Sequence, residues 1–315
     1  MLKIFFGTKE QNIDVTEIVY KKLMKQNIIF IQNNDENRVP YFTDPALGKF
    51  KSIFITDENN VTTEYPGFLH VFIDTANNNK IYTENIPQYI LDVFPNYDIC
   101  DKLLHIQGQI KINFGTFEQE FPEQIMSLLY LKGDEKVLEI GSNIGRNSLI
   151  ISHILSQKQN NNFVTLECDY EIYKKLKHNR NINNMNFFIE NSALSKRNLI
   201  QKGWDTIESD VILEGYKKVN TITLDELYKK YKIDFDTLIL DCEGAFYNIL
   251  IDMPEILNKV KLIIVENDYD ELYKKEYVDD ILKKNNFYVD YFRAGGGRVC
   301  SDNFFEVWKR DIIEI

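Results

Sequence analysis

A glycine-containing segment is the first part of this sequence whose residue types could do chemistry. This segment joins a short apolar run to Glu139 and then to two glycines, and it reads Lys136-Val-Leu-Glu-Ile-Gly-Ser-Asn-Ile-Gly145. Glycine lets the chain turn tightly and lets a ligand approach the backbone without a Cβ in the way. Residues Arg146–Leu155 contain neither glycine nor proline and predict a helix, whose first N–H groups and positive dipole end face the turn. A strand, a glycine turn and a helix in this order indicate a nucleotide-type ligand site at the carboxyl edge of a parallel sheet.

Acidic residues stand at the ends of four predicted strands, and these are Glu139, Glu167, Asp241 and Glu266. The carboxyl ends of parallel strands share one edge of a sheet, where ligands bind, so we expect the four acids to gather there. An acid at this position can instead cap the next helix. Glu167 lies 22 residues after Gly145 (167 minus 145), a position from which an acid binds a ribose diol.

The glycine turn departs from the dinucleotide-binding pattern at one position. It reads Gly-Ser-Asn-Ile-Gly, so Asn143 stands where G-x-G-x-x-G has the glycine that admits a pyrophosphate. This disfavours a dinucleotide. A ligand with a ribose and no phosphate fits better, and S-adenosylmethionine is such a ligand.

The same segment resembles a known family. Glu139–Gly145 is similar to the E/D-x-G-x-N-x-G loop of class I S-adenosylmethionine-dependent methyltransferases, in the form typical of the FkbM family. Five further segments resemble motifs of that family in the same order: Tyr173–Asn183, Asn191–Ser195, Asn220–Asp225, Leu240–Gly244 and Ile264–Glu266. The resemblance runs from about Phe114 to Lys309.

The resemblance implies roles for individual residues. Those expected to line the methionine end of S-adenosyl-L-methionine lie in the glycine loop and are Glu139, Gly141, Asn143 and Gly145, and Ser142 of the same loop is also expected to bind the cofactor. Glu167 would hold the ribose, and Asn191 and Ser192 would lie near the adenine. Asp241 and Glu243 would face the acceptor. The family often has another acid after D-x-E-G-x, but Phe246 stands there in this chain.

The carboxylates Asp241 and Glu243 suit the chemistry of such an enzyme. Methyl transfer is an in-line displacement at a carbon already activated by a sulfonium, so positioning of the acceptor can supply most of the acceleration. A sugar hydroxyl is a weak acid, and a carboxylate within hydrogen-bond reach can take its proton. We predict Asp241 as this base and Glu243 as the second candidate. A divalent cation held by the pair is an alternative that stays open, and no metal is predicted.

The order of predicted elements gives the fold. Residues 1–104 hold five of the seven prolines and several short β-type runs, and they predict a small, mostly β N-terminal module. Residues 105–315 predict an α/β domain, because strands and helices alternate from Val137 onward and imply a doubly wound, Rossmann-like parallel sheet. Phe287–Phe292 and Asn303–Trp308 have no helix between them and predict a C-terminal antiparallel hairpin. We also expect a strand over Lys111–Phe114.

Bulk properties restrict the partners. The net charge of -11 and the pI near 5.0 disfavour binding to a nucleic-acid backbone. No apolar run approaches the length that spans a bilayer, and the N-terminus becomes polar after six residues, unlike a signal peptide. We therefore expect a cytoplasmic protein with no nucleic-acid or membrane partner and a small-molecule or glycan acceptor. A homo-oligomer stays open. Four widely spaced cysteines without a C-x-x-C pair give no zinc spacing.

The predicted function is S-adenosylmethionine-dependent O-methylation of a sugar or glycan hydroxyl, as in glycan biosynthesis. The alternative is a non-catalytic module that binds the cofactor, a glycan or a protein, with a relic methyltransferase domain. A nicotinamide oxidoreductase is the third hypothesis. Trp204, in a segment predicted as irregular, is either a stacking wall for a sugar or part of the core. Arg298, in the glycine-rich tip before the last strand, is either an anion ligand or part of a plain turn.

Overall fold

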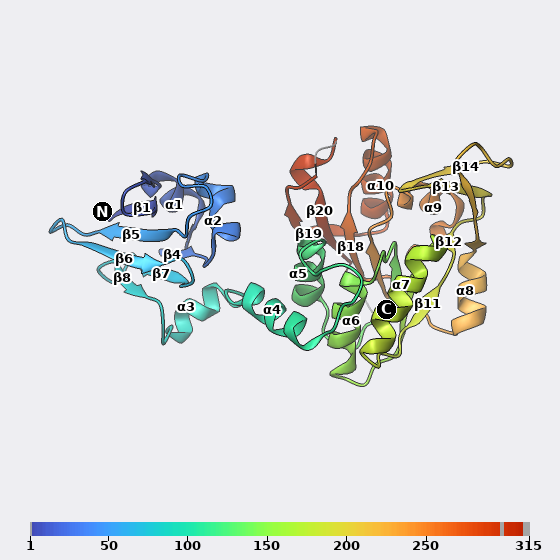
Figure 1. Ribbon diagram of the computed structural model, residues 1–315, viewed down its shortest axis with the longest axis horizontal. Helices are drawn as coiled ribbons and strands as arrows, with labels where there is room; N and C mark the ends of the chain where they lie inside the picture. Colours follow the sequence, from blue (N-terminus) through green and yellow to red (C-terminus); the bar gives the residue numbers. More distant parts are fainter. Residues whose placement is uncertain (1, 297–298, 311–315) are drawn as a thin grey trace. The chain divides into compact units, whose positions relative to one another are not determined.

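Two sets of strands build the structure, and they belong to separate parts of the chain. The computed structural model describes residues 2–296 and 299–310. Contacts divide the chain into the units Met1–Asp98 and Ile99–Ile315 (Figure 1). Arg298, whose role the sequence left open, lies outside the described residues.

The first unit is β-rich, as predicted, and contains two antiparallel sheets. One has the strand order β2 (Asn12–Asp14), β1 (Lys3–Gly7), β5 (Ser52–Thr56) and β6 (Thr62–Pro66). The other has the order β3 (Met24–Lys25), β4 (Ile28–Ile31), β7 (Val71–Asp74) and β8 (Lys80–Tyr82). Three helices accompany them: α1 (Thr16–Lys22), α2 (Asp35–Phe42) and α3 (Gln88–Val93). Alternating strand residues such as Ile4, Phe6 and Ile53 are buried and form the core of this unit.

The second unit is built on a seven-stranded sheet, which confirms the predicted doubly wound fold. Its strand order is β11 (Phe188–Glu190), β10 (Phe163–Leu166), β9 (Val137–Ile140), β17 (Thr237–Leu240), β18 (Leu262–Glu266), β20 (Phe305–Lys309) and β19 (Tyr288–Arg293). The first five strands are parallel, and β20 is antiparallel to both of its neighbours. The predicted antiparallel hairpin is therefore confirmed. The sequence did not predict that β20 enters the sheet between β18 and β19.

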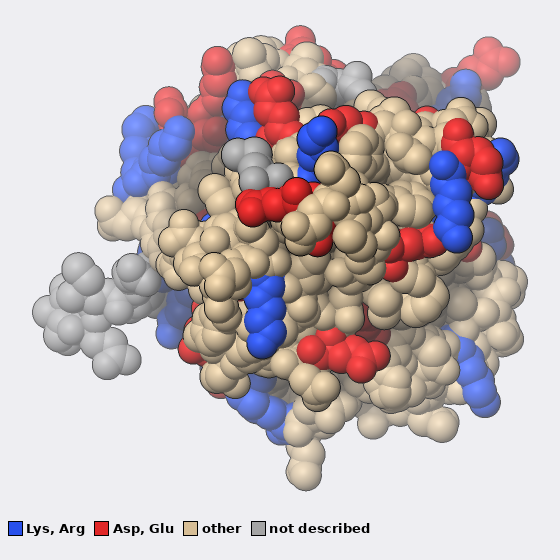
Figure 2. Space-filling view, turned by 90° about the vertical axis from the view of Figure 1, so that its left-hand side faces the viewer, with Lys and Arg blue, Asp and Glu red and all other residues tan. Residues whose placement is uncertain are grey.

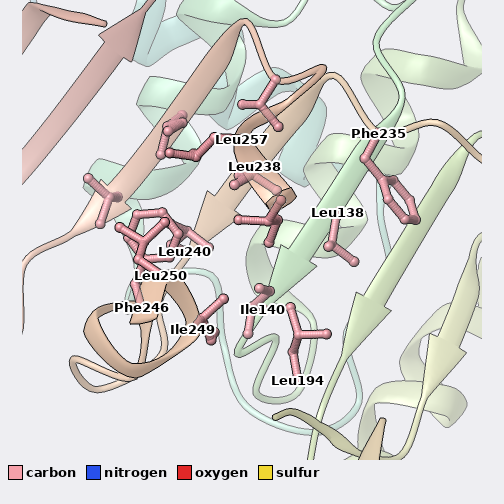
Figure 3. Packing of buried hydrophobic residues seen from close by; sticks show 14 of the residues in the cluster. Leu138, Ile140, Leu194, Phe235, Leu238, Leu240, Phe246, Ile249, Leu250 and Leu257 are labelled. Atoms are coloured by element: carbon pink, nitrogen blue, oxygen red, sulfur yellow. The ribbon is translucent and has the colours of Figure 1, made fainter. Parts of the chain in front are cut away.

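Helices cover both faces of this sheet. One face packs against α8 (Leu224–Tyr231), α9 (Phe246–Asp252) and α10 (Leu272–Lys284). The other packs against α4 (Ile99–Gln109), α5 (Phe121–Tyr130), α6 (Arg146–Ser156) and α7 (Tyr170–Ile182). Because side chains alternate along a strand, Leu138 and Leu238 lie in the first core, whereas Val137 and Ile239 lie in the second. Figure 3 shows Leu138 and Leu238 in the first core.

The predicted strand over Lys111–Phe114 is wrong, because side chains rather than a neighbouring strand bind its backbone. The N–H of Lys111 donates to Oδ1 of Asn183 (2.8 Å), and the N–H of Asn113 donates to Oδ1 of Asn179 (3.0 Å). Both asparagines belong to the end of α7 and the residue that caps it. The segment is therefore fixed against a helix and has no place in a sheet.

The segment around Trp204 is ordered rather than irregular. It forms a three-stranded antiparallel sheet of β13 (Leu199–Lys202), β14 (Asp205–Glu208) and β15 (Lys217–Val219). Trp204 lies in the turn between β13 and β14 and is 60% exposed, so it is not a core residue. Among the described residues, no helix combines the length and the apolar character that crossing a bilayer requires.

Candidate active site

The glycine loop after β9 touches the ends of both neighbouring strands. Gly141 has a φ of +85°, and a Cβ built there would lie 1.6 Å from the carbonyl oxygen of Asp241. The N–H of Gly141 donates to the carbonyl of Leu166 (3.1 Å), and the N–H of Asp241 donates to the carbonyl of Ile140 (3.1 Å). The strand ends that carry Glu167 and Asp241 therefore lie on either side of Gly141, at one edge of the sheet. Only glycine has the conformation and the small size that this close approach needs.

Polar side chains in the loop hold its shape. Asn143 has a φ of +47°, its Oδ1 accepts from the N–H of Ile144 (2.8 Å), and its Nδ2 donates to Glu120 (3.1 Å). The hydroxyl of Ser142 donates to the carbonyl of Leu166 (3.1 Å). Gly145, with a φ of +92°, is the N-cap residue of α6. These contacts explain the residue types in the loop, and the contact of its members with a cofactor stays a prediction.

Glu139 is buried inside the sheet and carries a perturbed carboxyl group. It is 2% exposed, and it accepts hydrogen bonds from the hydroxyls of Thr165 (2.7 Å) and Ser148. Burial raises the pKa of Glu139 to about 8, against the lowering effect of these two hydroxyls. The group is therefore mostly protonated at neutral pH, and it joins β9 to β10 and α6.

The residues predicted to hold the ribose and adenine lie at the ends of β10 and β11. Glu167 is buried, and its Oε1 accepts from the N–H of Asp169 (2.8 Å). Burial raises the pKa of Glu167 to about 7. Asn191 donates to the carbonyl of Glu167 (2.8 Å), and Ser192 is buried beside it in the chain. The structure thus brings Glu167, Asn191 and Ser192 to one edge, next to the glycine loop.

Three strand-end acids point to the same face of the sheet, and α5 supplies two more. Along their strands, Glu139, Asp241 and Glu266 have the parity of the residues in the second core, on which α5 packs. One carboxylate oxygen from each of Glu123, Asp241 and Glu266 lies within 4.8 Å of the others. We call these three residues the acidic trio. A small cavity joins the trio to Gly141. Glu167, beyond Gly141, is not among the residues that line this cavity.

The contribution of α5 was missed from the sequence. Glu120 is the N-cap residue of α5 and Glu123 lies in its first turn, where acids are common because they favour the positive end of the helix dipole. Nothing in the local pattern distinguishes these glutamates from ordinary capping residues. Three glutamates close together around the start of an apolar helix, Glu118, Glu120 and Glu123, are the one signal that could have drawn attention to them.

The electrostatics of the cluster are dominated by burial and by like charges. Burial, followed by Glu266 and Glu120, raises the pKa of Asp241 well above its usual range. Burial and the neighbouring Glu123 raise the pKa of Glu266 to about 9, and burial raises that of Glu123 to about 7. Arg146 pairs with Glu120 (Nη1–Oε1 2.7 Å). The trio therefore retains protons near neutral pH or needs a cation.

Glu243, the second predicted base, is more exposed to solvent than the residues of the trio. It is exposed, and its φ is +51°. Asp241 is half-buried, and Glu243 contributes to the raised pKa of Asp241. Phe246, which stands where the family often has an acid, is buried at the start of α9 in the first core.

The sheet order, the glycine loop and the acids at the carboxyl edge define the second unit as a Rossmann-like domain of the methyltransferase class. The family model that describes the methyltransferase FkbM domain matches residues 139–296 of this sequence. The match covers 158 of the 315 residues (296 minus 139 plus 1), which is half of the chain. The chain belongs to the FkbM methyltransferase family, and the predicted resemblance is confirmed.

The solved structures that match this chain are distant from it in sequence. An O-methyltransferase from Bacillus cereus, in complex with SAH, is 15% identical with a TM-score of 0.38, and the match covers 71% of this chain and 96% of that one. A putative O-methyltransferase from Klebsiella pneumoniae is 12% identical with a TM-score of 0.37, and the match covers 71% of this chain and 96% of that one. A search among curated proteins gave no match.

Proposed function

We propose that this protein transfers a methyl group from S-adenosylmethionine to a hydroxyl of a sugar or glycan. The observation that carries the proposal is the closeness of the glycine loop to Asp241, whose backbone carbonyl lies where a Cβ of Gly141 would be. This brings the loop that would bind the methyl donor next to an acid that can accept a proton. S-adenosylmethionine would supply an activated methyl group.

The donor set of the site fits this cofactor. The carboxylate of Glu167 accepts from backbone N–H groups, including that of Asp169, and its remaining lone pairs can accept from a ribose hydroxyl. Asn191 fixes the backbone carbonyl of Glu167 and so orients that acid. The turn that carries Asn143 is shaped by side-chain contacts and offers backbone groups at the start of α6.

Proton transfer from the acceptor is the step that we assign to the protein. Bound S-adenosylmethionine would supply the methyl carbon to which the acceptor oxygen bonds, and the carbon–sulfur bond would break with its electron pair left on sulfur. The hydroxyl proton passes to Asp241, whose raised pKa makes it a stronger base once it is ionised. Glu243, two residues further on and exposed, is the second candidate.

The sugar or glycan acceptor rests on the family resemblance and on charge. The net charge of -11 opposes binding to the phosphate backbone of RNA. On the face drawn in Figure 2, the described lysines and arginines are dispersed among carboxylates and do not gather into a basic stripe. A neutral sugar meets no such repulsion.

Isotope-labelled S-adenosylmethionine with a panel of sugars, nucleotide sugars and glycans tests the proposal. We expect labelled product from the wild-type protein, and Asp241→Asn should lower the rate by about 10²–10⁴-fold while cofactor binding by calorimetry persists. Asp225→Asn, an exposed acid in the first turn of α8, is the matched control and should keep full activity. Absence of cofactor binding contradicts the proposal. Binding without turnover on any acceptor favours the non-catalytic alternative.

A further inference from the structure

The acidic trio lacks the cationic and hydroxyl partners that balance the other acids around it, and the hydrogen bond between Glu123 and Glu266 needs a proton shared by the two carboxyl groups. Glu120 forms an ion pair with Arg146, and Glu139 accepts from two hydroxyls. By contrast, within residues 2–296 and 299–310 no lysine or arginine forms an ion pair with any member of the trio. Three neighbouring carboxyl groups are thus left without positive charge.

Glu123 provides a second and independent sign of a missing partner. The residue is 7% exposed, and its Oε2 is buried without a hydrogen-bond partner among the described residues. An unpartnered buried oxygen is unfavourable, and more so if it is charged. This side chain lines the cavity that also contains Asp241 and Glu266. The unpartnered oxygen therefore belongs to a residue that already faces the rest of the trio.

The spacing of the trio suits a single small cation. One oxygen from each of the three residues lies within 4.8 Å of the other two. Around Mg²⁺, with oxygen ligands at about 2.0–2.1 Å, adjacent ligands are about 3 Å apart and opposite ones about 4.2 Å. The ligands come from three separate elements, α5, β18 and the end of β17, so the folded unit brings them together.

We propose that Glu123, Asp241 and Glu266 bind one divalent cation of the Mg²⁺ or Mn²⁺ type. Such cations prefer carboxylate oxygens and leave several positions for water or substrate. Glu243 is exposed and does not belong to this group of ligands. The site therefore differs from an Asp241–Glu243 pair, which the sequence alone left open as a metal site.

The role of this cation rests on the proposed function. A divalent cation lowers the pKa of a hydroxyl that it binds. The O–H bond of the acceptor then breaks more easily, and its electron pair stays on the oxygen that the cation stabilises. A carboxylate has two oxygens, so Asp241 can bind the cation with one and receive the proton with the other. The cation would thus place the acceptor oxygen and help it lose its proton.

Binding of Mn²⁺ alone tests the site without any substrate. Free Mn²⁺ gives a six-line electron paramagnetic resonance signal that is lost when the ion binds to a protein. Titration of EDTA-treated, full-length protein should show one bound Mn²⁺ per chain. Glu123→Gln and Glu266→Gln should each weaken this binding by about 10-fold or more, because each removes a charged ligand. Glu118→Gln removes an exposed charge five residues before Glu123 and should leave the affinity unchanged.

Folding and cofactor binding are measured in parallel. Both tryptophans, Trp204 and Trp308, lie in the second unit, so their fluorescence shows whether each variant is folded. An undiminished free-Mn²⁺ signal at millimolar concentration overturns the inference, as does equal Mn²⁺ affinity in folded Glu123→Gln and wild-type protein. Calorimetry with S-adenosylmethionine on metal-free protein tests the proposed function separately. If the cofactor binds and methyl transfer is undiminished in EDTA, the role assigned to the cation is wrong and the methyltransferase proposal stands.

Discussion

Replacing Gly141 with alanine tests how closely the ends of β9 and β17 approach. The substitution meets two penalties. A φ of +85° is unfavourable for a residue with a Cβ by about 1–2 kcal/mol. The added Cβ would also lie 1.6 Å from the carbonyl oxygen of Asp241 and 2.6 Å from its carbonyl carbon. Because both contacts are to backbone, the loop must move, and overpacking of this kind costs about 1–3 kcal/mol. We expect Gly141→Ala to lower the free energy of unfolding by about 2–5 kcal/mol.

Two other glycines of the same unit separate these penalties. Gly203 has a φ of +60° with nothing within 4 Å of an added Cβ, so Gly203→Ala should show the backbone penalty alone. Gly108 lies in α4 with open space around it, and Gly108→Ala should stabilise the protein by about 0.5–1 kcal/mol. Urea unfolding followed by tryptophan fluorescence measures all three. If Gly141→Ala loses no more stability than Gly203→Ala, the close approach of the two strand ends is wrong.

Two further predictions concern buried ionisable side chains. The folded protein keeps the proton on Glu139 up to about pH 8, whereas the ordinary pKa of a glutamate is 4.5. The contribution of this bound proton to the free energy of unfolding is therefore complete below pH 4.5 and is lost as the pH rises through 8. Between pH 6 and pH 8 this loss is about 2 kcal/mol in wild-type protein, and Glu139→Gln, which resembles the protonated form, should remove it in urea unfolding. An unchanged pH dependence in that variant contradicts the assignment. Arg146→Met leaves Glu120 buried without its cation and should destabilise the second unit by about 3 kcal/mol or more. The double variant with Glu120→Gln should recover part of this loss, and no recovery would show that the pair is not coupled.

The elements that the sequence predicted well are those whose local pattern decides their structure. β18 ends at Glu266, as predicted, since a run of buried aliphatic residues is typical of a strand covered on both faces. The helix after the glycine loop begins at Arg146 as expected, because Gly145 provides the turn and no breaker follows. The four strand-end acids were found from the same pattern, and three of them meet at one small cavity.

The features that the sequence did not predict depend on distant partners. Lys111–Phe114 has a β-type composition, but asparagines at the end of α7 bind its backbone. Residues 33–37 have the polar composition that is typical of a turn, yet α2 begins at Asp35. The Nζ of Lys51 lies 2.8 Å from the carboxylate of Asp35, and local composition does not reveal this contact. Glu123 contributes to the site only because α5 packs over the sheet, and a single sequence contains no sign of that packing.

The place of β20 in the sheet decides when the edges of the neighbouring strands become covered. Strands β18 and β19 are synthesised first, but in the finished sheet β20 separates them. Until Phe305–Lys309 has emerged, each of these strands has an open edge that can pair with another chain. A protein truncated after Arg293 would therefore leave the edges of β18 and β19 open, so β20 protects this domain from aggregation.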